Sequence, residues 1–205
     1  MADRRDGVAE SKDGEFRNGM PFFGGSLWLD LLNSTLVDGG VRHDMIGMPD
    51  GFSAWLDAAG LPPAGDDPAR SDLQDFRESL RRTVDLLRRR NPMPADVLAD
   101  VNARLKTTVV RFELVPEGSG LRLDERLDPG TSGPAGFIAE DFARFVCHHE
   151  PERLKRCSNP ACTMVFYDRG KNNARRWCTM SICGNRDKVA RYRSRHGAVS
   201  RASGQ

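Results

Sequence analysis

The chain has 205 residues, of which 39% are hydrophobic and 29% are charged, so we expect a folded protein and exclude a disordered one. This length accommodates one ordinary domain and a smaller second one. No segment approaches the roughly 18 consecutive apolar residues that a membrane helix requires. The polar N-terminus also has no apolar stretch of the kind found in secretory signals. We therefore expect a cytoplasmic protein that does not associate with membranes.

The charge is divided unevenly along the chain, although the total is only +2. From Arg153 to the C-terminus there are 13 Lys and Arg residues and two acidic residues, a net of +11. The preceding part has 18 basic and 27 acidic residues, a net of −9. Such a division is typical of a polyanion-binding segment joined to a different kind of domain.

Helical periodicity dominates the part before residue 150. In the first expected helix, Ser26 is the predicted N-cap, and Trp28, Leu31, Leu32 and Thr35 share one face. The S-x-x-Q sequence at Ser71 resembles a capping box that would begin the longest helix. Helices are predicted over residues 26–36, 53–59, 71–90, 94–106 and 134–149. Residues 62–70 are expected to form a loop.

Two segments alternate apolar and polar residues instead. They cover residues 109–115 and 121–127 and flank the sequence PEGSG, which favours a turn. This pattern predicts a β-hairpin. The fold class expected for residues 20–150 is therefore α+β, mostly helical, with a β-hairpin or small sheet.

Four of the five cysteines form two pairs with identical spacing, Cys157 with Cys162 and Cys178 with Cys183. In a chain without a secretion signal, paired cysteines favour metal binding over disulfides. Four thiolates suit one structural zinc ion, because a closed tetrahedral site leaves no position for substrate. An iron–sulfur cluster and free or disulfide-bonded thiols are the alternatives. Cys147 is interpreted as a core residue.

The segments around the cysteines predict a treble-clef-like zinc domain over residues 151–197. Residues 164–168 and 174–178 resemble two strands joined by a turn, and a helix is expected to begin near Cys183. So short a segment depends on the metal for its folding free energy. Residues 1–19 and 198–205 are expected to be disordered tails.

The zinc domain is predicted to bind nucleic acid through basic side chains. Five of the ten residues from Arg186 to Arg195 are basic, and only Asp187 opposes them. Such residues neutralise phosphates and release counterions. The predicted nucleic-acid-binding residues are Arg175, Arg176, Arg186, Lys188, Arg191, Arg193 and Arg195.

DNA is preferred over RNA because no aromatic-rich stacking strand is present. The other side of the helix, with Val189, Tyr192 and His196, is expected to pack on Phe166 and Trp177. An RNA-binding protein, an adaptor that docks on an acidic protein surface, and a merely solvated basic face are the alternatives. The sequence leaves the oligomeric state open, a homodimer included.

Polar residues also occur within the first helix. Asp30 and Asn33 lie on an otherwise apolar element, and Arg77 and Arg81, one turn apart, are candidate partners. These four residues are candidates to line a pocket for a small-molecule effector. A satisfied buried network and the solvent face of a surface helix are the structural alternatives.

The sequence gives no indication of an enzyme. It has no G-x-S-x-G, H-E-x-x-H or P-loop pattern. The run from Cys147 to Glu150 contains metal-ligand residue types, but consecutive helical residues point in different directions.

The cysteine-rich segment resembles the CGNR zinc-finger family, through both cysteine pairs, RRWC, and Cys183-Gly184-Asn185-Arg186. The sequence from Leu29 to Ser34 is similar to the LDFVNT motif that begins the ABATE domain, although LLNS stands in place of FVNT, and residues 53–61 are similar to the segment that follows. The resemblance covers roughly residues 20–196. It implies a bacterial stress-induced transcription regulator with an α/β sensor domain and a zinc-containing, DNA-binding tail.

Overall fold

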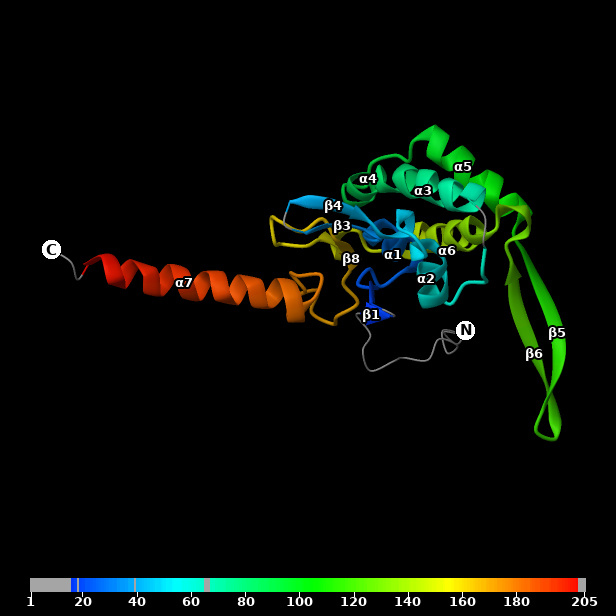
Figure 1. Cartoon of the computed structure of the whole chain (residues 1–205). Helices are drawn as coiled ribbons and strands as arrows, with labels where there is room; N and C mark the ends of the chain where they lie inside the picture. Colours follow the sequence, from blue (N-terminus) through cyan, green and yellow to red (C-terminus); the bar gives the residue numbers. More distant parts are fainter. Residues whose placement is uncertain (1–15, 18, 39, 65–66, 203–205) are drawn as a thin grey trace.

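The computed structural model describes residues 16–17, 19–38, 40–64 and 67–202. Within these ranges, seven α-helices and four two-stranded antiparallel sheets form the fold. Figure 1 shows a helical body from which two elements project, a long hairpin at one end and the C-terminal helix at the other. The α+β class is confirmed, with a mostly helical N-terminal part and a small C-terminal part that contains the four cysteines.

Each described strand pairs with its neighbour in the sequence, and the helices make up the rest of the body. The first elements are β1 (Phe16–Arg17), β2 (Met20–Pro21), α1 (Leu27–Asn33), β3 (Thr35–Asp38), β4 (Val41–Asp44) and α2 (Gly51–Ala59). The next are α3 (Asp67–Arg81), α4 (Val84–Arg88), α5 (Ala95–Thr107), β5 (Val109–Glu117), β6 (Gly120–Asp128) and α6 (Pro134–His148). The last are β7 (Leu154–Arg156), β8 (Val165–Tyr167) and α7 (Asn185–Ala202).

Helix α1 is the centre of the body, because six of its seven residues are buried. Trp28 packs edge-on against Phe142 and Phe145 of α6, at ring-centroid distances of 5.1 Å. A carboxylate from α6 accepts hydrogen bonds from polar groups at the start of α1. Asp141 Oδ2 accepts hydrogen bonds from the Trp28 backbone N–H and from Ser26 Oγ. Ser26 is the N-cap residue as predicted, but its side chain makes no capping bond and donates to Asp141 instead.

The predicted helices near α2, α5 and α6 are confirmed, with ends shifted by one or two residues. The longest predicted helix differs in two respects. Ser71 lies inside α3, which begins at Asp67, so the predicted capping box is wrong. The helix also breaks at Thr83, whose backbone N–H and hydroxyl both donate to the carbonyl of Leu80. This tight turn separates α3 from α4 while both keep their apolar residues buried.

The described part of the chain before residue 150 contains two hairpins that are longer than two residues per strand, and only one of them was predicted. The predicted hairpin of β5 and β6 is confirmed, with strands of nine residues each. A second hairpin, β3 with β4, was missed, and Thr35 belongs to it rather than to a helix. Helix α1 ends early because the hydroxyl of Ser34 donates to the carbonyl of Leu31. At the N-terminus, Phe16–Arg17 pairs with Met20–Pro21, whereas residues 1–15 and 18 of the predicted tail lie outside the described residues.

In the C-terminal part, the predicted strand at residues 164–168 is present as β8, but its predicted partner is wrong. Strand β8 pairs with β7, and residues 174–178 form no strand. The start of this segment is instead held by Lys155 Nζ, which donates to the carbonyl of Arg175 and to that of the preceding Asn173. Helix α7 continues to Ala202, beyond the expected end of the domain at residue 197.

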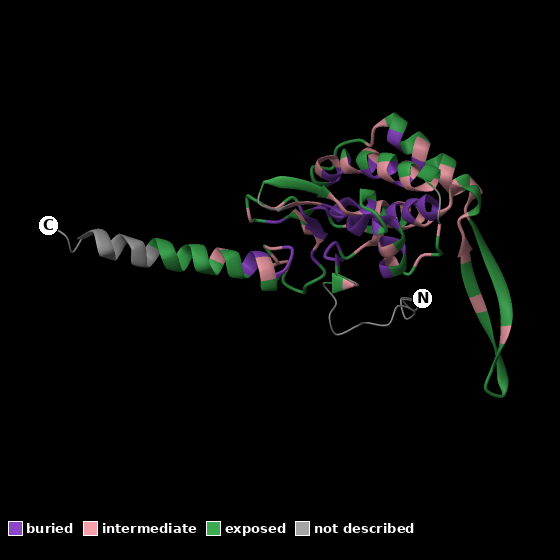
Figure 2. Cartoon of the chain, viewed as in Figure 1, coloured by how far each residue is buried: buried purple, intermediate pink, exposed green. Residues whose placement is uncertain are grey.

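Helix α7 projects from the body (Figures 1 and 2). The sequence predicts that one side of this helix packs on Phe166 and Trp177. The side chains of Val189 and Tyr192 are 48% and 63% exposed, so the expected packing of these two residues on Phe166 and Trp177 is wrong. The side chain of His196 lies outside the described residues. Within the described ranges, no helix has the length and apolar character needed to cross a membrane.

The two parts share one core rather than meeting at a loose junction. Asn33 of α1 donates to the carbonyl of Val165 at 2.8 Å and accepts from its backbone N–H at 2.9 Å. The amide therefore pairs with the edge of β8 as a neighbouring strand would. Leu154 and Val165 of the C-terminal part belong to the same buried cluster as Trp28.

We expect Asn33→Ala to destabilise the whole protein. The substitution leaves a buried N–H and a buried carbonyl of Val165 without partners, and each such loss costs about 1–3 kcal/mol. Urea denaturation followed by tryptophan fluorescence should show a lower unfolding free energy, by about 2–4 kcal/mol. Asn172→Ala, at an exposed position, is the control and should change little. An unchanged midpoint for the Asn33 variant would contradict this account.

Candidate metal centre and basic helix

The four predicted metal ligands meet in one cluster. The sulfur atoms of Cys157, Cys162, Cys178 and Cys183 all lie within 4.8 Å of one another. Cys178 Sγ is 3.8 Å from Cys162 Sγ and 3.7 Å from Cys183 Sγ. A disulfide requires about 2.0 Å, so these are separate thiols. Cys147, in contrast, lies outside the cluster and is exposed, which corrects its interpretation as a core residue.

The spacing of the sulfurs fits a single zinc ion. Zinc–sulfur bonds of about 2.3 Å in a tetrahedron place the sulfurs about 3.8 Å apart. Cys157, Cys178 and Cys183 are buried, which is typical of a closed structural site. The donor set is complete without water or substrate, so the centre holds one structural zinc ion.

The elements that present the four sulfurs are of two kinds. Cys157 and Cys162 lie in the turn between β7 and β8, and the backbone N–H of Cys157 donates to the carbonyl of Met164 across that turn. Cys178 and Cys183 lie just before and within the π-helical turn Met180–Gly184, which leads directly into α7. The cluster therefore fastens the start of α7 to the β7–β8 hairpin.

Hydrogen bonds, burial and mutual repulsion shift the pKa values of Cys162, Cys178 and Cys183. The Cys178 backbone N–H donates to Cys157 Sγ, and Asn159 Nδ2 donates to Cys183 Sγ, both at 3.4 Å. Hydrogen bonding with Cys178 lowers the pKa of Cys162 to about 5, and the same bond raises the pKa of Cys178. Burial raises the pKa of Cys183 to about 11. Four thiolates so close together repel, and a divalent cation removes that repulsion.

A small apolar cluster surrounds the sulfurs and joins them to the N-terminal part. Phe23, Met164 and Phe166 are buried beside the cysteines. The Arg175 guanidinium lies over the ring of Phe166, with its central carbon 4.3 Å from the centroid. It also donates to the carbonyls of Phe23, Trp177 and Cys178. Arg175 was predicted to bind nucleic acid, but its guanidinium is engaged inside the protein.

An ion pair between the partly buried Lys155 and the buried Asp168 orders the loop between β8 and the second cysteine pair. Lys155 Nζ lies 2.8 Å from Asp168 Oδ2, and Asp168 also accepts from the backbone N–H groups of Gly170 and Arg175. Although burial opposes ionisation, these donors hold the pKa of Asp168 below its usual range. Sequence reasoning missed this role. The available signal was that Asp168 is one of only two acidic residues in a basic segment.

The remaining predicted nucleic-acid-binding residues are exposed where the structure describes them. Arg176 extends over the ring of Trp177 at 4.6 Å. Arg186, Lys188, Arg191 and Arg193 are exposed on α7, and Arg191 forms an ion pair with Asp187 of the preceding turn. The side chain of Arg195 lies outside the described residues.

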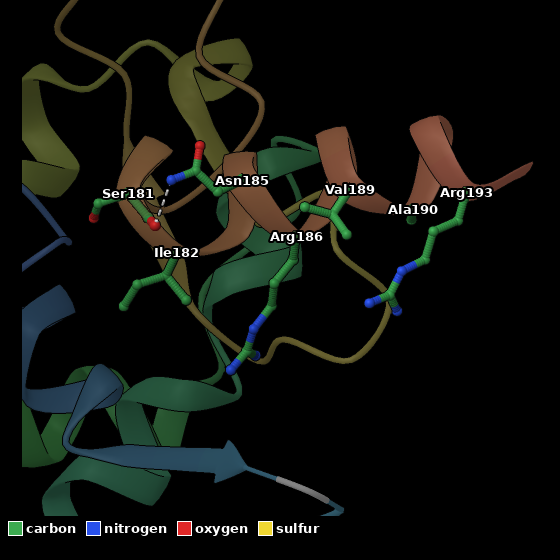
Figure 3. Close-up of a pocket in the computed structure, with 7 residues that line it drawn as sticks. All are labelled: Ser181, Ile182, Asn185, Arg186, Val189, Ala190 and Arg193. Carbon is green, nitrogen blue, oxygen red and sulfur yellow. Dashed lines mark hydrogen bonds between the residues drawn. The ribbon is translucent and has the colours of Figure 1, made fainter. Parts of the chain in front are cut away.

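An open hollow lies along the first turns of α7 (Figure 3). Ile182 and Val189 provide apolar groups, and Arg186 and Arg193 extend from the same side of the helix. The side-chain amide of Asn185 donates to the carbonyl of Ser181 at 2.9 Å. This bond closes the junction between the zinc-site turn and the helix.

The four residues predicted to line an effector pocket each have a partner within the protein. Asn33 bonds to β8, and Asp30 Oδ1 accepts from the Gly24 backbone N–H at 2.7 Å. Arg77 donates to Ser34 Oγ, and Arg81 donates to the carbonyl of Leu32. These contacts support the structural alternative, a satisfied buried network.

Asp44 completes that network and was missed by sequence reasoning. Both of its carboxylate oxygens accept from Arg77, at 2.7 and 2.6 Å. Although partial burial opposes ionisation, this pairing lowers the pKa of Asp44. The residue lies 33 positions from Arg77 in the sequence, so no local pattern reveals the pair.

Comparison with known proteins assigns both parts of the chain. Residues 25–149 match the ABATE family, described as "Putative stress-induced transcription regulator". Residues 153–196 match the CGNR zinc finger. The two matches follow one another in the order that the resemblance implied. No curated protein matches the chain.

We expect the purified protein to contain one zinc ion per chain and Cys178→Ser to lose most of it, because three thiolates leave the site open. Elemental analysis measures both. Cys147→Ser removes a thiol outside the cluster and should keep the full zinc content. Iron with acid-labile sulfide in the wild-type protein would contradict the zinc assignment.

The buried carboxyl of Asp30 predicts a pH-dependent stability. Burial raises its pKa to about 7, and the bond from Gly24 offsets only part of this effect. The folded protein keeps the proton up to about pH 7, whereas the unfolded chain releases it near pH 4. This group therefore favours folding less as the pH rises through that range.

Asp30→Asn keeps an acceptor for Gly24 but does not titrate. Urea denaturation should show that the wild type loses about 2–3 kcal/mol more than this variant between pH 5 and 8. Equal losses in the two proteins would show that the Asp30 pKa is not raised.

Proposed function

Because the chain belongs to the ABATE family and carries a CGNR zinc finger, we propose that it is a bacterial transcription regulator whose basic C-terminal helix binds DNA. The observation that carries the proposal is α7 itself, an exposed helix with basic residues on opposite sides. We propose a treble-clef arrangement for the zinc part, since one cysteine pair lies in a hairpin turn and the other at the start of a helix. The regulator acts by binding, without catalysis, in the cytoplasm.

The positions of the basic residues suit a helix that lies in the major groove. Each residue of a helix turns by about 100°. Arg186 and Arg193 therefore lie on one side, and Lys188 and Arg191 lie on nearly the opposite side. The major groove admits one α-helix, and phosphates border it on both sides. Basic residues on both flanks of α7 can then contact both DNA strands.

The position of α7 leaves room for the duplex. The helix has 18 residues, about 27 Å in length, and it points away from the body (Figure 1). The part before Arg153 has a net charge of −9, which disfavours contact between DNA and the body. The zinc site fixes the first turn of α7, so the direction of the helix is set before DNA binds.

The N-terminal part is proposed as the sensor of a ligand or partner. It shares a core with the zinc part through Asn33 and Val165, so a change at α1 alters the support of the zinc part. The alternative function is an adaptor that docks α7 on an acidic protein surface or on RNA. The arrangement of basic residues on two opposite flanks favours duplex DNA over a single flat protein surface.

We expect the double substitution Lys188→Glu and Arg193→Glu to weaken binding to random duplex DNA at least tenfold. The two residues lie on opposite flanks, so the slope of log affinity against log salt should fall by about 2. Fluorescence anisotropy at two salt concentrations measures both effects. Arg89→Glu with Lys106→Glu, at exposed positions of the body, makes the same change of charge and should leave affinity nearly unchanged.

Absent or salt-insensitive binding by the zinc-loaded wild type would overturn the DNA proposal. Competition with structured RNA separates the nucleic acids, since tighter binding to RNA would favour the RNA alternative. If the double variant keeps DNA binding but loses a protein partner in a pulldown, the adaptor alternative is favoured.

A further inference from the structure

The projecting hairpin of β5 and β6 has one apolar face, which we call the arm face. Directly paired residues of an antiparallel hairpin share a face, and so do residues two apart. The register pairs Phe112 with Glu125 and Leu114 with Leu123. The arm face consists of Val110, Phe112, Leu114, Pro116, Leu121, Leu123, Glu125 and Leu127.

The opposite face of the hairpin is charged and forms its own ion pairs. Arg111 pairs with Asp128 at 2.7 Å, and Asp124 accepts from Arg126 at 2.8 Å and from Arg122 at 2.9 Å. These charged side chains are stable in contact with water. A hairpin with one apolar face and one charged face is typical of a strand pair that buries only its apolar side.

The arm face is nevertheless exposed. Phe112, Leu114, Leu121 and Leu123 are 62%, 64%, 69% and 55% exposed, and Val110 is 40% exposed. Figure 2 shows the hairpin extending from the body as mostly exposed ribbon, with a few segments of intermediate burial. Within the described part of the chain, no other helix or strand packs extensively on either strand. A two-stranded hairpin alone is marginally stable in water, so this one requires a partner.

We propose that the arm face binds the arm face of a second copy of this chain, forming a two-fold symmetric dimer. The low charge of the arm face favours an apolar partner surface of the same kind. Glu125 is its one charged residue among eight, and the Glu125 carboxylate acts electrostatically on Arg144 of α6 in the same chain. A face without excess charge fits neither nucleic acid nor a charged protein, but it matches an identical apolar face.

The available area is sufficient for a dimer. With roughly 200 Å² for a fully exposed large side chain, the five apolar side chains offer about 600 Å² per copy. Two copies then bury about 1,200 Å², the lower end of stable interfaces. The N-terminal segment of the same chain is a poor candidate to cover the arm face, because the sequence of residues 1–15, MADRRDGVAESKDGE, is mostly polar.

Stacking of the two arms leaves the basic helices accessible. The hairpin and α7 project from opposite ends of the body (Figure 1). Two twisted ribbons packed face to face lie about 10 Å apart, as the sheets of a sandwich do. Each copy contributes the same residues, which is the condition for a closed two-fold interface. Dimerisation through the arm face does not depend on whether α7 binds DNA.

Sedimentation equilibrium of the full-length zinc-loaded protein tests the proposal. The wild type should approach twice the 22.8 kDa mass of one chain as concentration rises. Leu114→Glu with Leu123→Glu should give a monomer, because four carboxylates would meet at the interface. Both leucines are exposed, so far-UV circular dichroism and zinc content should stay as in the wild type.

Val115→Glu is the matched control. It places a new carboxylate on the charged face of the same strand, opposite Arg122, and should leave the dimer intact. Hydrogen exchange should show that residues 109–128 become protected as concentration rises. A monomeric wild type at every accessible concentration would overturn the proposal. A dimer that persists in the Leu114 and Leu123 double variant would overturn it too, by placing the interface elsewhere.

Discussion

The convergence of four cysteine sulfurs within 4.8 Å is the constraint on which the C-terminal structure depends. Fifteen residues separate the two pairs, and the part of them that follows β8 forms no strand that would hold it in place. One zinc ion supplies that hold, together with the ion pair of Lys155 and Asp168. Because Cys183 lies in the turn that begins α7, the metal also sets where the helix starts and in which direction it leaves the body.

The zinc part is joined to the helical part by main-chain contacts as well as by packing. The Asn33 amide bonds to both backbone groups of Val165, and the Tyr167 N–H donates to the carbonyl of Gly24. Arg175 adds a bond to the carbonyl of Phe23 while it covers Phe166. The guanidinium of this residue in the basic segment is thus engaged inside the protein. Its neighbour Arg176, beside Trp177, remains exposed.

The basic surface of α7 and the apolar arm face lie at opposite ends of the body. The helix carries cationic groups in a position open to a large polyanion, and the hairpin carries apolar groups on one side and paired charges on the other. Neither element packs on the body along its length (Figure 2). Their stability therefore comes from the zinc site for α7 and, in our proposal, from a second chain for the hairpin.

The sequence by itself determined the metal ligands, the order of the two family matches and most helices, because cysteine spacing and apolar periodicity are local patterns. The tertiary structure alone decided the partner of β8, the engagement of Arg175 and the exposure of Val189. Periodicity shows which residues share a face, but it does not show whether another element covers that face. The hydrogen-bond partners of Asp141, Asp44 and Asn33 lie 113, 33 and 132 positions away in the sequence, so only the packed fold brings them within hydrogen-bonding distance.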